Sequence, residues 1–193
     1  MSKNLIIRAR QLLLLMVFSL VAIAPLHAQV KLEIVKASSQ AYPIAIVDHA
    51  TNNQKFLEVV INDLHRSGRF IPKVGLAVPE QLNNVGQADS GIWRAAGINF
   101  IAILTPKGNM LHVEVGDTFT KSVRASRDFQ YVNDEKGQRA VAHKVADFIY
   151  EAITGVPGSF SSKVAYVSRN NRNFSLVVAD ADGAYPQVIL ESN

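Results

Sequence analysis

The stretch RAVAHKVADFIYEAITGVPGSFSSKVAYVSR, residues 139–169, contains the change of pattern that decides the fold. Its first half repeats apolar residues at helical spacing, in Val141, Val145, Phe148, Ile149 and Ala152. Asn133 or Asp134 is suited to begin this helix, and Gly155 is a typical helix end. After Pro157 the pattern changes to short strand-like segments with hairpin spacing, which is typical of all-β structure. The stretch therefore predicts a long helix that ends at Thr154, followed by a domain boundary near Pro157.

The residues before this helix predict an α/β domain at 42–156. Strands are expected at 42–48, 98–106, 110–119 and 122–132, with a short helix at 90–96. A Thr-x-x-Gln capping box, Thr51 to Gln54, predicts the start of another long helix, and Gly68 its end. Pro72 indicates an edge strand after that helix. This order of elements predicts a mixed sheet that the two long helices cover on one face.

The residues after the boundary, 157–193, have an all-β pattern. SKVAYVSR and FSLVVADADG are two predicted strands separated by the turn NNRN, and PQVILES begins a third. Asp180, Asp182 and Gly183 also fit part of a calcium loop. In that register, however, Val178 and Ile189 would occupy ligand positions. The sequence therefore favours a tight turn at Asp182–Gly183, in which glycine supplies the positive φ, over a metal site.

The first 28 residues have the pattern of a secretory signal peptide. Positive charges at Lys3, Arg8 and Arg10 precede an apolar run over 12–24, and LHA at 26–28 offers a small residue for cleavage before Gln29. An uncleaved N-terminal anchor is the alternative, but the run is short for a membrane span of about 20 residues. The sequence predicts an exported chain without membrane insertion after cleavage.

An N-terminal arm, residues 29–41, follows the predicted cleavage site. Its apolar residues alternate with polar ones before SSQAYP interrupts the pattern, which fits a strand that pairs with a partner. The candidate partner-binding residues are Gln29, Val30, Lys31, Leu32, Glu33 and Ile34. An edge strand of the chain's own domain is the alternative.

Composition excludes several classes of function. The predicted signal peptide holds three of the 20 Lys and Arg residues and none of the 16 Asp and Glu, so the remainder is nearly neutral, at 17 against 16. No basic patch is left to indicate nucleic-acid binding. The chain has no cysteine, which excludes disulfides, thiolate metal sites and a lipid-anchoring cysteine. With no nucleophile elbow and no Gly-rich phosphate loop, we expect no enzyme, no cofactor and no metal.

Arg139, His143, Asp147 and Tyr150 form a polar face on the long predicted helix. Their spacing brings Arg139 within reach of His143, and His143 within reach of Asp147. A proton relay or half of a metal site is one interpretation, but His-x-x-x-Asp offers only two ligands. The sequence favours a solvated face or a candidate inter-domain face.

The segments together resemble the TolB family of the Tol–Pal cell-envelope system. The resemblance is most specific at residues 139–169 and extends to YPIAIVD at 42–48, FLEVVINDLHRSGRF at 56–70 and VVADADGAYPQVIL at 177–190. It implies an α/β domain followed by a six-bladed β-propeller, of which 157–193 would be a linker and an incomplete first blade. It also implies a periplasmic adaptor that maintains outer-membrane integrity and supports envelope constriction at division.

The resemblance implies two protein partners. The arm that begins at Gln29 would engage a TolA-like inner-membrane protein. A Pal-like lipoprotein binds the propeller in this family, but the resemblance places only the start of that propeller in these residues, which puts Pal binding in doubt. One alternative is an α/β binding module related to the lipoproteins of secretion channels or wall-synthase activators, without their lipid anchor. Another is a peptidase whose propeller gates a hydrolase domain, which would need a nucleophile elbow that this sequence lacks.

Overall fold

The computed structural model describes residues 41–51, 53–171 and 173–192. The predicted signal peptide and the predicted arm up to residue 40 lie outside these residues. The elements are β1 (Tyr42–Asp48), α2 (Gln54–Arg66), β2 (Phe70–Lys73), two short 3₁₀ turns (Gly75–Ala77 and Val85–Gln87), α3 (Ser90–Ala96), β3 (Phe100–Lys107), β4 (Met110–Asp117), β5 (Ser122–Gln130), α4 (Glu135–Thr154), β6 (Lys163–Asn170), β7 (Asn173–Asp180) and β8 (Gln187–Ser192). No helix in the described ranges is long and apolar enough to cross a membrane.

The first five strands form the mixed sheet that the sequence predicts. Their order is β2-β1-β3-β4-β5, with β1 parallel to β2 and β3, and with β4 antiparallel to both of its neighbours. β1 and β3 are interior strands, and each has a run of buried residues, as strands covered on both faces require. Pro72 lies in β2 at the sheet edge, where its missing N–H costs no ladder bond.

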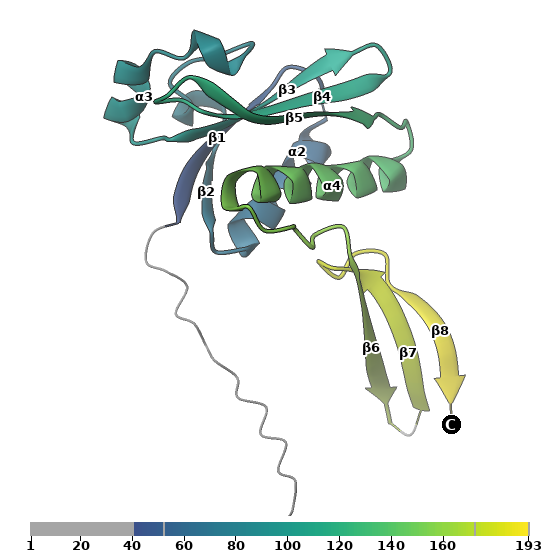
Figure 1. The fold of residues 1–193 in the computed structure, drawn as a ribbon. Helices are drawn as coiled ribbons and strands as arrows, with labels where there is room; N and C mark the ends of the chain where they lie inside the picture. The colour runs from purple at the N-terminus through teal and green to yellow at the C-terminus, as the bar shows by residue number, and fades with distance from the viewer. Residues whose placement is uncertain (1–40, 52, 172, 193) are drawn as a thin grey trace, which may run out of the picture. The chain divides into compact units, whose positions relative to one another are not determined.

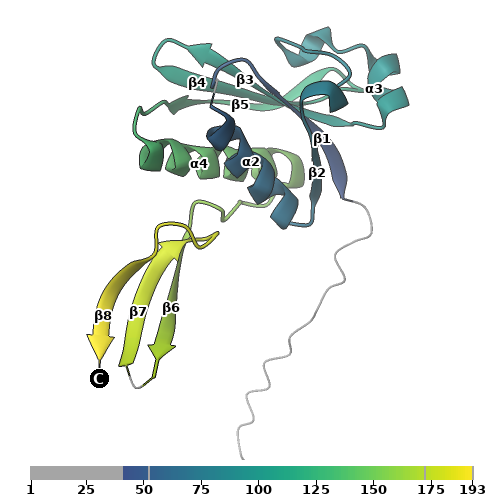
Figure 2. The same cartoon turned by 180° about the vertical axis from the view of Figure 1, so that it is seen from behind.

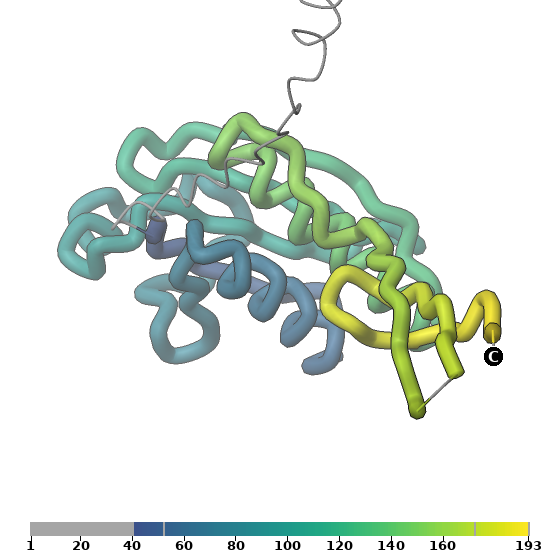
Figure 3. Tube along the Cα trace, turned by 90° about the horizontal axis from the view of Figure 1, so that it is seen from below, coloured from purple at the N-terminus to yellow at the C-terminus, as the bar shows by residue number. Residues whose placement is uncertain are grey.

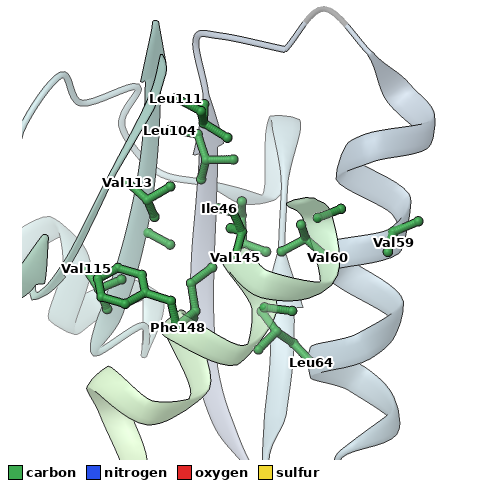
Figure 4. Packing of buried hydrophobic residues seen from close by; sticks show 14 of the residues in the cluster. Ile46, Val59, Val60, Leu64, Leu104, Leu111, Val113, Val115, Val145 and Phe148 are labelled. Atoms are coloured by element: carbon green, nitrogen blue, oxygen red, sulfur yellow. The ribbon is translucent and has the colours of Figure 1, made fainter. Parts of the chain in front are cut away.

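The two long helices cover one face of this sheet. Figures 1 and 2 show α2 and α4 lying side by side on the same face, and Figure 3 shows the pair from below. Val60 and Leu64 of α2 and Val145 and Phe148 of α4 point into a shared core (Figure 4). The strands contribute Ile46, Leu104, Leu111, Val113 and Val115 to the same core. The predicted α/β layering is confirmed.

The opposite face of the sheet is also partly covered, which the sequence analysis missed. A second core contains Trp93 of α3, together with Val78, Leu82 and Val85 of the segment between β2 and α3. These residues pack on the side chains of β1 and β3 that point away from the long helices, which are Ala45, Val47, Ile101 and Ile103. The covering segment has little helical or strand periodicity, so its burial was not readable from pattern alone.

The predicted capping box of α2 is wrong, although the helix is present. The N-cap is Asn53, whose side chain accepts hydrogen bonds from the backbone N–H groups of Lys55 and Phe56. Thr51 instead donates its hydroxyl to the carboxylate of Asp48 at the end of β1. A carboxylate one turn upstream therefore competes successfully for the threonine, and the helix begins two residues later.

The ends of α4 agree with the prediction. Asp134 is the N-cap and accepts a hydrogen bond from Gly137 N at 2.7 Å. Gly155 ends the helix with a φ of 73°, a left-handed conformation that glycine adopts without cost. The long helix is thus fixed at both ends by the residue types that the sequence offers there.

The last three strands form a separate antiparallel sheet in the order β6-β7-β8. The predicted turn at Asp182–Gly183 connects β7 and β8, and Gly183 has a φ of 85°. Val177 and Ala179 of β7 are buried, whereas many large apolar side chains of this sheet are exposed. The exposed ones are Val164, Tyr166, Val167, Phe174, Val188, Ile189 and Leu190.

Candidate functional site

A buried aspartate–histidine pair joins the two long helices. Asp63 of α2 and His143 of α4 face each other, with Asp63 Oδ2 2.6 Å from His143 Nδ1. Both side chains are buried. Asp63 also accepts from the guanidinium of Arg66, one turn further along α2. The carboxylate therefore holds the imidazole in a fixed orientation, with its second nitrogen, Nε2, directed away from α2.

The turn between β7 and β8 completes this cluster. Asp182 Oδ2 accepts a hydrogen bond from Arg139 Nη2 and lies 3.9 Å from His143 Nε2. Its other oxygen, Oδ1, accepts from Ala184 N at 3.1 Å. Burial alone would raise the pKa of Asp182, but the bond from Ala184 and the nearby charges of Arg139, His143 and Arg66 outweigh it and lower the pKa. The ionised carboxylate is the form that these contacts favour.

The cluster continues into β6 and β7 through Asp180. Arg139 Nε lies 3.7 Å from Asp180 Oδ2, too long for a hydrogen bond, and the Lys163 ammonium contacts the other Asp180 oxygen. Two buried polar atoms of the cluster, Arg139 Nε and His143 Nε2, have no hydrogen-bond partner among the described residues. Both nitrogens face the carboxylates of the β-sheet segment. The contact between α4 and these carboxylates therefore depends on attraction between charges, and not every buried donor in it makes a hydrogen bond.

Asp147, one turn beyond His143 on α4, binds the segment that leads into β6. Its oxygens accept from Phe160 N at 2.6 Å and from Ser161 N at 3.0 Å. Gly158 passes so close that an added Cβ would lie 2.6 Å from the Asp147 Cα. Glycine is required there because the backbone of the segment approaches the helix directly.

Tyr150 supports the same segment with aromatic contacts. Its ring packs edge-on against Phe160, with 5.7 Å between ring centroids, and against Phe70 of β2 at 5.8 Å. Edge-to-face geometry at these separations is the favourable arrangement for aromatic pairs. Phe160 is thus held by its backbone through Asp147 and by its side chain through Tyr150.

The structure places all four residues of the predicted polar face against other parts of the chain, but not in the predicted way. Among the described residues, no hydrogen bond or ion pair joins Arg139 to His143, or His143 to Asp147. Each reaches a different segment instead, because α2 and the β7–β8 turn supply better-placed partners. A solvated face is wrong for His143, which is buried.

Asp63 is the functional residue that the sequence analysis missed. It lies within the apolar pattern of α2, between the buried residues Val60 and Leu64. A carboxylate on the buried side of an amphipathic helix costs free energy unless it is paired. That position is the sequence signal that would have identified it.

Asp63, His143 and Asp182 offer ligand atoms that all lie within 4.8 Å of one another, so a metal site has to be considered. The donors do not fit one. His143 Nδ1 already faces the Asp63 carboxylate, and Arg139 occupies the Asp182 oxygen that a metal bound at Nε2 would need. Two guanidiniums beside three donors disfavour a further cation. The arrangement is an ion-pair network that fixes one segment against another.

A polar pocket of about 320 Å³ adjoins this network. It lies where α2 and α4 begin, and Arg139, Asp182 and Tyr185 form part of its wall. The ion pair between Lys55 and Glu135 also lines it. The pocket wall combines charged and amide groups with the apolar side chains of Phe56 and Val59, which suits contact with another polypeptide segment.

The fold and this network define a class of protein: an α/β domain whose long helix is tied by charged groups to a following antiparallel β-sheet. The candidate partner-binding residues 29–34 lie outside the described residues. Residues 30–116 match the family described as the TolB amino-terminal domain.

Similar proteins extend the comparison beyond that domain. The chain is 37% identical to the Tol-Pal system protein TolB of Bordetella parapertussis over 188 residues, which are 93% of this chain and 42% of the relative. It is 33% identical to the protein of the same name from Methylococcus capsulatus, over 90% of this chain and 43% of the relative. The crystal structure of TolB from Acinetobacter baumannii is similar with a TM-score of 0.64 and 31% identity, over 79% of this chain and 39% of that one. The chain therefore spans about two fifths of the length of these relatives.

Proposed function

We propose that the chain is part of a periplasmic adaptor of the Tol–Pal system, which acts through protein–protein contacts and without catalysis. The observation that carries the proposal is the similarity to proteins named Tol-Pal system protein TolB along 93% of the chain. In this role the protein maintains outer-membrane integrity and supports constriction of the envelope at division. The buried polar groups of α4 support it as well, because they are engaged in internal ion pairs.

The arm 29–41 is the proposed contact with a TolA-like inner-membrane protein. Alternation of Val30, Leu32 and Ile34 suits strand addition, in which main-chain hydrogen bonds give affinity and alternate side chains give specificity. β1 has β2 on one side and β3 on the other, so a strand of the arm that belonged to this sheet would have to pair with β2 or β5, the edge strands of the described sheet.

Arg139, His143, Asp147 and Tyr150 are the proposed inter-domain face. Each contacts the segment after residue 157, through Asp182, Phe160 or Ser161. We infer that β6, β7 and β8 are strands of a first propeller blade. Three consecutive antiparallel strands with exposed apolar side chains fit a blade that packs on a neighbouring one. A Pal-like partner belongs to the whole propeller and is not proposed for these residues alone.

Binding to the periplasmic domain of a TolA-like protein tests the role of the arm. Deleting 29–36 should abolish binding and leave the melting temperature nearly unchanged. Leu32→Asp should weaken binding strongly, because it places a charge on the apolar face of the strand. Glu33→Gln, on the opposite face of the same strand, is the matched comparison and should weaken binding much less, because its side chain points away from the apolar face.

Two results would contradict this assignment. If the deleted chain still binds the TolA-like protein, the arm is not the contact. If the deletion instead destabilises the chain by several kcal/mol, the arm is an edge strand of its own domain, since each buried aliphatic side chain contributes roughly 1.5–3 kcal/mol.

A further inference from the structure

His143 occupies a position that none of its proposed roles explains. It is a buried histidine at the junction of α2, α4 and the β7–β8 turn, between the carboxylates of Asp63 and Asp182. A structural contact between helices needs only Nδ1, which faces Asp63. The second ring nitrogen, Nε2, is buried and faces Asp182 at 3.9 Å, and it has no hydrogen-bond partner in the part of the chain that the structure describes.

The two nitrogens respond differently to protonation. An ionised carboxylate only accepts hydrogen bonds, so the proton of the neutral ring lies on Nδ1, where it is donated to Asp63 Oδ2. Nε2 of the neutral ring then presents a lone pair to the Asp182 carboxylate. Protonation replaces that lone pair with an N–H donor and a positive charge. The interaction with Asp182 thereby changes from unfavourable to favourable, while the bond to Asp63 persists.

The other charged groups around the ring are close to balance. Arg66 of α2 faces Asp63, Arg139 of α4 faces Asp182, and Lys163 of β6 faces Asp180 of β7. With Asp63, Asp182 and Asp180 ionised, three carboxylates stand against three permanent cations. The added proton on His143 is nearest to two of those carboxylates, since its nitrogens are the atoms that face them.

We propose that His143 is a proton-dependent clasp between the α/β domain and the following β-sheet. Imidazole is the side chain that changes charge between about pH 5 and pH 8. Acidification within this range tightens the hold of α4 on the β7–β8 turn, and alkalinisation loosens it. The clasp acts on the orientation and mobility of the β-sheet segment, whatever partner that segment binds, so it does not depend on the proposed Tol–Pal role.

Hydrogen exchange of the turn in the full chain tests the clasp. The reporters are the amides of Asp180, Gly183 and Ala184, which are bonded to Ala184 O, Asp180 O and Asp182 Oδ1. Their protection factors, corrected for the intrinsic effect of pH on exchange, should rise roughly three- to tenfold between pH 8 and pH 6, as expected for a weak charged contact. Amides of β3 report on the global fold.

Three variants assign the effect. In His143→Gln the side chain keeps a donor but does not titrate, and the rise between pH 8 and pH 6 should disappear. Asp182→Asn should also abolish it, because the charge that faces Nε2 is gone. His112→Gln removes an exposed histidine that is likewise paired with an aspartate and should behave as the unmodified chain.

The outcomes separate cleanly. A rise in the unmodified chain and in His112→Gln, absent from His143→Gln and Asp182→Asn, supports the clasp. Protection that is flat or falls on acidification in the unmodified chain overturns it, and so does a rise that survives in His143→Gln. If His143→Gln loses protection in β3 and has therefore not folded, Asp182→Asn decides: a rise that survives there overturns the proposal.

Discussion

The molecule contains two aspartate–histidine pairs with almost the same distance and very different surroundings. Asp63 and His143 lie 2.6 Å apart between α2 and α4, with side chains 1% and 3% exposed. Asp128 and His112 lie 2.5 Å apart on β5 and β4, with side chains 33% and 29% exposed. Each aspartate also contacts a cation, Arg66 or Lys107 respectively.

The difference shows that burial, and not distance, decides what such a pair does. Water screens the pair on β4 and β5, and pairs of this kind contribute little to stability. Between the helices the side chains of Asp63 and His143 are shielded from solvent, so each depends on its partners, and losing one leaves the other uncompensated. The buried pair therefore fixes the position of α4 against α2, and it holds the His143 ring so that Nε2 faces the β7–β8 turn.

Removing one partner of the buried pair should have the largest effect. Asp63→Ala leaves the buried His143 without its carboxylate and removes the partner of Arg66, whose side chain is 44% exposed. We expect it to lower the free energy of unfolding by about 3–5 kcal/mol, measured by urea denaturation. Asp63→Asn, which keeps the volume and an acceptor, should cost less. A loss below about 1 kcal/mol for the alanine variant would mean that the pair is not desolvated as the structure shows.

Asp147 should have an intermediate effect, because it is partly buried and has two backbone donors. Asp147→Ala removes the acceptor of Phe160 N and Ser161 N, and these groups can recover some hydrogen bonding from water. We expect a loss of about 1–3 kcal/mol in the free energy of unfolding. The same variant should expose 157–162 to limited proteolysis while cleavage elsewhere is unchanged.

Gly158→Ala provides an independent check on that contact. The added methyl group would meet the Asp147 backbone, so it should loosen the same segment with Asp147 still present. Normal protease resistance in both variants would show that the segment is not held by Asp147.

Acid should release the β7–β8 turn through Asp182. The folded pKa of this carboxyl is lowered, so its contribution is present above the unfolded pKa of about 3.9 and is lost as pH falls through the folded value. We expect a loss on the order of 1 kcal/mol from the docking of the turn, because the carboxylate is largely buried but has few partners. Asp182→Asn should remove this acid dependence.

Together with the His143 clasp, this acid dependence means that the β7–β8 turn docks most tightly at an intermediate pH. The turn is held most firmly where Asp182 is ionised and His143 is protonated. Protection of the turn amides that increases steadily down to pH 3 would contradict the assignment to Asp182.

Much of this fold was predictable because its signals are local. The long helix 135–154 followed from five apolar residues at helical spacing and from the residues Asp134 and Gly155 at its ends. The mixed sheet followed from the order of strands and helices. The start of α2 was not predictable from the same rules, because Thr51 is captured by Asp48, a competition that depends on where β1 ends.

The candidate site was only half predictable. The sequence placed Arg139, His143, Asp147 and Tyr150 on one helix. Their partners are distant in the chain, however: Phe160 lies 13 residues from Asp147, and Asp63 lies 80 residues from His143. Helical spacing describes which residues share a face and says nothing of what packs on it. The apolar residues of β6 and β8 show the same limit, since consecutive apolar residues of this kind are typical of buried strands although these are exposed.

The smallest effect is expected at the exposed pair. Hydrogen bonds from Lys107 and from His112 lower the pKa of Asp128. Because the folded pKa of Asp128 is lowered, its ionised carboxylate stabilises the fold above the unfolded pKa, and this stabilisation is lost in acid. Solvent and salt screen the pair almost completely, however, because the groups lie at the surface. Asp128→Asn should therefore leave the midpoint of urea unfolding unchanged at pH 7 and physiological salt.

The exposed pair is informative because its geometry matches that of the buried one. Asp128→Asn and Asp63→Asn are the same chemical change next to the same type of ring, so the difference between their unfolding midpoints isolates the effect of burial. The measurement should be repeated at low salt, where a surface pair gains strength and a buried pair does not. If Asp128→Asn destabilises the chain as much as Asp63→Asn at physiological salt, the outer face of β4 and β5 is shielded from water in solution, and its two charged groups would then be part of a contact surface.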